Sequence, residues 1–191
     1  METTFDKTKT ALVVIDLQKG IVAMPTEPHT STTVIANASS LADACRQNQI
    51  PVFLVRVSFS NDGHDRVNPI ADVPMMTNQI PDLSWSEIVP EMNPSPGDFV
   101  ITKHQWGAFY GTELDLQLRR RGIETILLCG ISTNIGVEST ARTAYELGYN
   151  QIFVEDAMAA RSAIEHEHAL KTVFPRMGRV RLLADVMTAL K

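Results

Sequence analysis

The chain has 191 residues, of which 44% are hydrophobic and 20% are charged, and its formal net charge is −5. This length suits a single domain spanning 1–191, and the negative charge argues against a nucleic-acid-binding surface. No apolar run reaches the ~20 residues that a membrane-spanning helix needs, and the chain does not open with the basic and apolar pattern of a signal peptide. We therefore expect a cytoplasmic protein with no nucleic-acid or membrane partner.

Strand and helix patterns alternate along the sequence. Short apolar, β-branched runs predict strands, and apolar residues spaced three or four apart predict helices. In chain order we expect a strand at 10–16, an irregular loop at 17–32, a helix at 32–49, a strand at 51–57, a long loop at 58–97, a strand at 98–102, a helix at 111–121, a strand at 124–129, a helix at 134–147, a strand at 151–155, a helix at 162–174, a strand at 180–183 and a helix at 184–190. This order predicts a three-layer α/β/α, Rossmann-like fold with a mainly parallel six-stranded sheet.

The stretch at 126–142 indicates where a functional site would lie. An apolar strand stops at Gly130, and the small polar residues after it suit the start of a helix, with Glu138 near its positive end. In α/β proteins this strand-to-helix turn points free N–H groups into the crevice where ligands bind. We therefore expect an acid and a base at neighbouring strand ends.

Asp16 and Lys103 stand at the ends of the predicted first and third strands. A carboxylate beside an ammonium is a plausible proton-transfer pair, because the lysine charge controls the ionisation of the acid. Taken alone, each residue is more often structural: a strand-end aspartate is usually a cap, and a strand-end lysine is usually a solvated charge.

Three segments together resemble the signature segments of the isochorismatase-like hydrolases, which include nicotinamidases, N-carbamoylsarcosine amidohydrolases and isochorismatases. They read VVIDLQKG, TKHQWGAFYGTEL and LLCGISTNIGVESTARTA, in the family's order. The resemblance implies that Asp16 and Lys103 are catalytic. It also implies a non-proline cis peptide at Ile131–Ser132.

The sequence departs from the amidases of this family at Gly136, where they carry a nucleophilic cysteine. A glycine cannot form an acyl-enzyme. Cys129 lies inside an apolar strand, and the nearby hydroxyl residues Ser132, Thr133 and Ser139 are better explained as capping or turn residues. No replacement nucleophile is evident from the sequence.

Isochorismatases proper also carry glycine in this part of the turn. That resemblance implies a non-covalent hydrolase in which Asp16 is a general acid toward a vinyl ether and water completes the hydrolysis. Two alternatives stay open: a catalytically silent small-molecule-binding or scaffolding protein, and an amidase that uses a surrogate nucleophile. The substrate itself is not specified by the sequence.

Further residues are candidates for the substrate pocket. The turn that would bind a substrate oxygen comprises Ile131, Ser132, Ile135 and Gly136, and the residues expected to contact substrate are Arg56, Gln18, Trp106, Phe109, Tyr110 and Asn134. Arg56 is expected to point into the same crevice as Lys103, although a salt bridge to Asp16 or to a loop acid is equally plausible. The aromatic residues are as well explained by loop packing or a subunit contact.

Neither a metal nor a cofactor is expected. His64 lies in a polar loop without ligand spacing, and His166 and His168 are two apart in a predicted helix and so face different sides. Asp156 follows the predicted fifth strand and is expected to cap the next turn. The long segment 58–97, with Trp85 and Trp106 nearby, suggests a homodimer or homotetramer acting on a small-molecule substrate.

Overall fold

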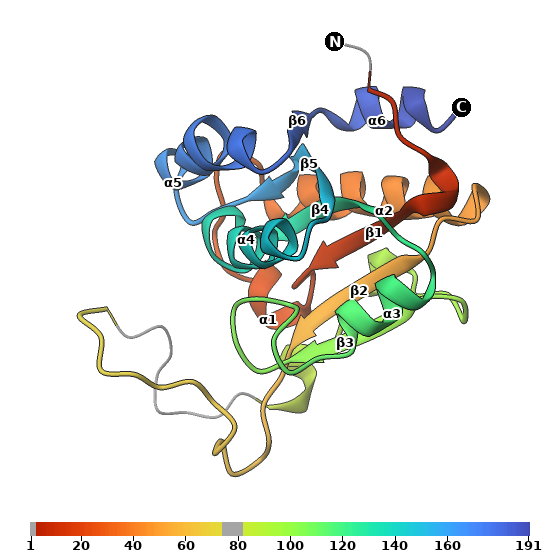
Figure 1. The fold of residues 1–191 in the computed structure, drawn as a ribbon. Helices are drawn as coiled ribbons and strands as arrows, with labels where there is room; N and C mark the ends of the chain where they lie inside the picture. The colour runs from red at the N-terminus through yellow and green to blue at the C-terminus, as the bar shows by residue number, and fades with distance from the viewer. Residues whose placement is uncertain (1–2, 74–81) are drawn as a thin grey trace.

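A computed structural model describes residues 3–73 and 82–191 (Figure 1). Six strands form one parallel sheet in the order β3-β2-β1-β4-β5-β6. The strands are β1 (Thr10–Ile15), β2 (Val52–Val57), β3 (Phe99–Lys103), β4 (Thr125–Ile131), β5 (Asn150–Ala159) and β6 (Arg179–Arg181). The predicted fold class, a parallel six-stranded sheet with helices on both faces, is confirmed.

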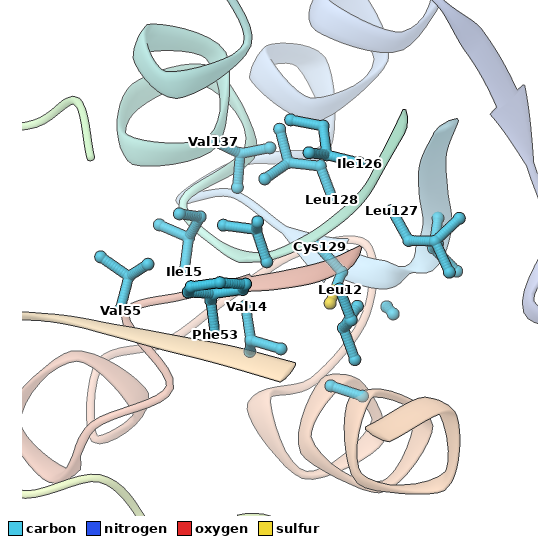
Figure 2. Close-up of a cluster of buried hydrophobic side chains, with 14 of the residues drawn as sticks. Leu12, Val14, Ile15, Phe53, Val55, Ile126, Leu127, Leu128, Cys129 and Val137 are labelled. Carbon is cyan, nitrogen blue, oxygen red and sulfur yellow. The ribbon is translucent and has the colours of Figure 1, made fainter. Parts of the chain in front are cut away.

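The two central strands, β1 and β4, are buried along their whole length. Strands covered on both faces need apolar side chains in both directions, which explains the continuous runs of Val, Ile and Leu. Figure 2 shows Leu12, Val14, Phe53 and Leu128 within this core. Burial of these residues fixes the strand ends, and so fixes the backbone from which the site residues project.

Helices cover the two faces of the sheet. They are α1 (Lys19–Val22), α2 (Ser31–Gln47), α3 (Leu114–Arg120), α4 (Glu138–Glu146), α5 (Ala163–His168) and α6 (Leu183–Ala189). The helices α2 and α6 contact each other and β5 on one face, while α3 and α4 lie on the other (Figure 1). The longest, α2, begins at the cap residue Thr30, whose hydroxyl accepts a hydrogen bond from the N–H of Thr33.

Several predicted boundaries differ from the structure. The predicted loop at 17–32 contains the short helix α1, and β5 extends four residues beyond its predicted end at 155. The predicted helix at 162–174 is composite: α5 continues as a π-helical turn at Ala169–Val173 and a 3-10 turn at Phe174–Arg176. Such local changes of helix type leave no clear periodic signal in a sequence.

Asp156 is a correction that follows from the longer strand. It lies inside β5, and its Oδ1 accepts a hydrogen bond of 2.7 Å from the backbone N–H of Leu183, at the start of α6. Asp156 therefore caps a helix distant in sequence, instead of the turn that follows 151–155.

The long segment 58–97 is described in two parts. Residues 58–73 extend away from the sheet (Figure 1, gold), and residues 82–97 contain 3-10 turns at Leu83–Ser86 and Pro90–Met92. Residues 74–81 lie outside the described residues, so the segment's expected role as an interface stays a prediction. Among residues 3–73 and 82–191, none of the helices has the length and apolar character that a membrane crossing needs.

Candidate active site

The carboxyl ends of β1, β3 and β4 bring the candidate residues together. Asp16 directly follows β1, with a backbone φ of 54°, and its N–H donates to the carbonyl oxygen of Val55 at 2.9 Å. The connections after β1 and β4 run to opposite sides of the sheet, which makes the boundary between these two strands a topological switch point. Ligands bind at such points in open α/β sheets.

Asp16 and Lys103 form a buried pair. The ammonium of Lys103 donates to Asp16 Oδ2 at 2.8 Å and to the carbonyl oxygen of Trp106 at 2.7 Å. Lys103 is 1% exposed and Asp16 is 6% exposed, so water screens this pair very little. The other carboxylate oxygen, Oδ1, is buried and has no hydrogen-bond partner among the described residues.

Burial raises the pKa of the Asp16 carboxyl above its ordinary value of 3.8, and the charge and hydrogen bond of Lys103 offset only part of that effect. Desolvation penalises the ionised carboxylate, and a nearby cation favours it. The protonated form of Asp16 is consequently more populated at a given pH than that of an exposed aspartate. This suits a group that donates a proton.

The turn after β4 lies directly over this pair. We call residues 132–137 the site turn. The peptide bond that leads into it, Ile131–Ser132, is cis. Thr133–Val137 form a π-helical turn that continues into α4. A Cβ atom added to Gly136 would lie 3.1 Å from Asp16 Oδ2 and 3.6 Å from Lys103 Nζ. A nucleophilic side chain at this position would therefore touch both partners, and the glycine leaves that position empty.

Gly130 permits the close approach of β4 to β1 just before the site turn. Its φ is +121°, and a Cβ there would lie 2.1 Å from the carbonyl oxygen of Ile15, the residue preceding Asp16. A side chain at Gly130 is thus excluded by both its backbone conformation and its neighbour.

Side chains hold the site turn at both ends. The hydroxyl of Thr140 donates to the carbonyl oxygen of Gly136 at 2.7 Å and accepts from the N–H of Ala108 at 3.1 Å. At the other end, Thr133 Oγ1 lies 2.8 Å from His166 Nδ1, and both residues are buried. The sequence does not predict either contact: Thr133 and Thr140 lie within a signature segment, but their partners His166 and Ala108 are distant in sequence, and no local pattern links them.

The two cysteines lie in the hydrophobic core, away from this crevice. Cys45 is on α2 and Cys129 is inside β4, and both are fully buried. Burial raises the pKa of the Cys45 thiol to about 12 and raises the pKa of Cys129 even further. Thiols in this state are inert, because the thiolate is the nucleophilic form.

Gln18 was expected to contact substrate, but its amide is committed to the main chain. Its Oε1 accepts from the N–H of Val57 at 2.8 Å, while Nε2 donates to the carbonyl oxygens of Val57 at 3.0 Å and Trp85 at 3.2 Å. The side chain is fully buried and joins the loop after β1 to β2. These hydrogen bonds give Gln18 a structural role, which is to link the two segments.

The expectation that Arg56 points into the same crevice as Lys103 is wrong. Arg56 is in register with Thr102, whereas Lys103 is in register with Val57. Successive side chains of a strand point to opposite faces, so Arg56 and Lys103 lie on opposite faces of the sheet. Arg56 Nε donates to Thr102 Oγ1 at 3.1 Å, and no ion pair joins it to any acid within 3–73 and 82–191.

The other expected contact residues separate into two groups. Phe109 is 7% exposed and stacks on Tyr149, so it belongs to the packed interior. Trp106 and Tyr110 are exposed, and Asn134 in the site turn has a buried Oδ1 without a partner in the described part of the chain. Among the six residues expected to contact substrate, Asn134 is therefore the one whose side chain has a buried acceptor without a hydrogen-bond partner in the described part of the chain.

Comparisons with known proteins show the family and the fold of the chain. A family model described as an isochorismatase domain matches residues 10–185. An uncharacterised isochorismatase family protein of Bacillus subtilis is 50% identical over 188 residues, covering 97% of this chain and 96% of that protein. A solved isochorismatase family protein of Burkholderia thailandensis has a TM-score of 0.95 at 46% identity, covering 100% of this chain and 99% of its own. Enterobactin synthase component B of Escherichia coli is 29% identical over 192 residues, which cover 97% of this chain and 65% of that protein.

Proposed function

This chain belongs to the isochorismatase family of hydrolases, and we propose that it hydrolyses a small molecule without a covalent intermediate, with Asp16 as the proton donor and Lys103 as its partner. The observation that carries the proposal is the absence of a side chain at Gly136. The Asp16–Lys103 pair is intact and buried, yet the position that would place a nucleophile against both of them carries no side chain.

Cys45, Cys129 and Thr133 are poorly placed to act as nucleophiles. Both thiols are buried in the core with raised pKa values, and the Thr133 hydroxyl is fully buried in its contact with His166. A hydroxyl attacks only when an adjacent base removes its proton and the substrate reaches the oxygen. We therefore propose water as the attacking group, because Gly136 carries no side chain that could attack.

The proposed reaction follows from the two oxygens of Asp16. Oδ2 is held by the ammonium of Lys103, whereas Oδ1 has no partner in the described residues and is the atom that would carry the proton. Asp16 donates this proton to the substrate, and the resulting positive charge is quenched when water forms the new C–O bond. One proton of the added water returns to Asp16, and the other passes to the leaving group as the bond to that group breaks, so the net change is the addition of one water molecule.

The sign of the pH dependence follows from this role. Asp16 must be protonated to donate, so turnover is present below its pKa and is lost as the pH rises through it. Because burial raises that pKa, the loss occurs at a higher pH than an ordinary aspartate would give. A cysteine hydrolase shows the opposite requirement, since it needs the deprotonated thiolate.

The experiment that tests the proposal measures turnover of isochorismate, nicotinamide and carbamoyl compounds before and after treatment with iodoacetamide. We expect turnover of a compound in this set and no loss of activity on alkylation, because Cys45 and Cys129 are buried. Inactivation that parallels alkylation of one thiol would favour the surrogate-nucleophile amidase. Tight binding of a compound without any turnover would favour the silent binding protein.

A further inference from the structure

His166 is a buried imidazole for which the proposed reaction has no use. It lies on α5 and is 1% exposed, and its Nδ1 is 2.8 Å from the hydroxyl oxygen of Thr133. Its Nε2 is buried without a hydrogen-bond partner in the described part of the chain. A buried polar atom without a hydrogen bond lowers the stability of the folded protein. The presence of a histidine at this position therefore needs an explanation.

The position of Thr133 supplies that explanation. Thr133 begins the π-helical part of the site turn, three residues before the glycine whose Cβ position touches Asp16 and Lys103. Thr140 holds the far end of the turn through the carbonyl oxygen of Gly136. His166 therefore supplies the side-chain contact at the near end, from a helix that packs directly on the turn.

The surroundings of His166 keep its ring neutral. The ring of His29 meets it edge-on at a centroid distance of 5.7 Å, Glu167 is its neighbour on α5, and Thr133–Val137 contain no titratable group. Burial, followed by His29, lowers the pKa of His166 to about 4, and Glu167 opposes this shift. The ring is thus uncharged at neutral pH, and it donates or accepts one hydrogen bond with Thr133 according to its tautomer.

We propose that His166 is a positioning residue for the active site: its contact with Thr133 holds the site turn in the place where Gly136 lies against Asp16 and Lys103. This inference rests on the proposed function only in taking the site turn as the wall of the active site. It adds that a residue of α5, remote from the three signature segments, determines the geometry of that wall.

The test uses the variant Gly136→Cys as a reporter that needs no substrate. Its thiol would lie beside both Asp16 Oδ2 and the Lys103 ammonium, whose charges set its ionisation, so its rate of alkylation by iodoacetamide reports how the turn is placed. The native thiols are buried and contribute little background. Into this reporter we would introduce His166→Leu, His166→Asn, Thr133→Val and Thr133→Ser, one at a time.

We expect His166→Leu and Thr133→Val each to change the alkylation rate by about tenfold, the effect of one lost hydrogen bond. His166→Asn and Thr133→Ser keep a polar atom near the original position and should restore most of the rate. Combining His166→Leu with Thr133→Val should have no more effect than either alone, because both remove the same contact.

Amide hydrogen exchange in the otherwise native chain provides a second measurement, in case the reporter variants do not fold. The N–H groups of Ile135 and Val137, which bond to the carbonyl oxygen of Ser132, should exchange about tenfold faster in His166→Leu than in His166→Asn. The proposal is overturned if folded His166→Leu protein keeps both the native exchange and the native alkylation rate, or if the two substitutions act additively. Neither readout involves turnover, so a failure of the proposed hydrolysis would leave both results interpretable.

Discussion

The residue that most constrains the chemistry is Gly136. The position of its missing Cβ is 3.1 Å from Asp16 Oδ2 and 3.0 Å from Ile15 Cγ2, so any side chain there enters the space between the acid and the core. Gly136 therefore carries no side chain that could act as a nucleophile beside the acid.

The variant Gly136→Cys tests whether only the nucleophile is missing. We expect it to gain amide hydrolysis that the native chain lacks, since the new thiol lies beside Lys103. The contact with Ile15 is tight and should reduce the free energy of unfolding by about 1–3 kcal/mol. The matched control is Gly97→Cys, where no atom lies within 4 Å of the added Cβ. A folded, alkylatable Gly136→Cys protein without amidase activity would contradict the expectation.

At the scale of elements, the approach of β4 to β1 positions the site turn. Gly130 makes this approach possible because it has no Cβ atom. A Cβ at this position would collide with the carbonyl group of Ile15. The clash involves backbone atoms, which cannot move aside as a flexible side chain can.

Gly130→Ala should therefore destabilise the protein far more than an ordinary glycine substitution. We expect a loss of more than about 3 kcal/mol in the free energy of unfolding, measured by urea denaturation. Gly122→Ala is the control, because Gly122 also has a positive φ, +65°, but its added Cβ meets no atom within 4 Å. It should lose only about 1 kcal/mol. Equal losses for the two variants would show that the collision at Ile15 is unimportant.

The sequence predicts the strands and helices because buried strands appear as apolar runs. It also predicts that Asp16 and Lys103 lie close together, because parallel strands end at the same edge of the sheet. It does not predict which face of the sheet Arg56 occupies, because that depends on a register that shifts by single residues. The sequence does not predict the backbone contacts of Gln18 either, since its partners in β2 and at Trp85 are distant in sequence. The contact of His166 with Thr133 spans 33 residues and left no local pattern.

For the molecule as a whole, the neutral His166 couples stability to pH. Its pKa is about 4 in the folded chain against an ordinary 6.5, so the unfolded chain binds the proton more readily. The resulting stabilisation is present above pH 6.5 and is lost as the pH falls toward 4, by up to roughly 3 kcal/mol. His166→Asn should flatten this part of the curve of unfolding free energy against pH. An unchanged slope in that variant would assign the acid sensitivity to other groups.

The assembly of the chain is also a prediction at this scale. Residues 58–73 extend from the sheet and expose Val67, Ile70 and Val73, more apolar surface than one small domain needs to present. We expect light scattering at micromolar concentration to give a mass two or four times that of the 21.1 kDa chain. A mass equal to that of one chain would refute the expected dimer or tetramer.

The most direct test of the central claim is the turnover number of Asp16→Asn on the compound that the native chain hydrolyses. This substitution keeps the shape of the side chain and removes the transferable proton, so kcat should fall by ~10²–10⁴. Asp43→Asn is the matched control, because Asp43 is exposed on α2 and should leave kcat unchanged. Circular dichroism and binding of the same compound would show that the Asp16→Asn protein is folded and still receives its substrate. Native turnover by folded Asp16→Asn protein would contradict the role of Asp16 as the acid, and with it the non-covalent mechanism proposed for this chain.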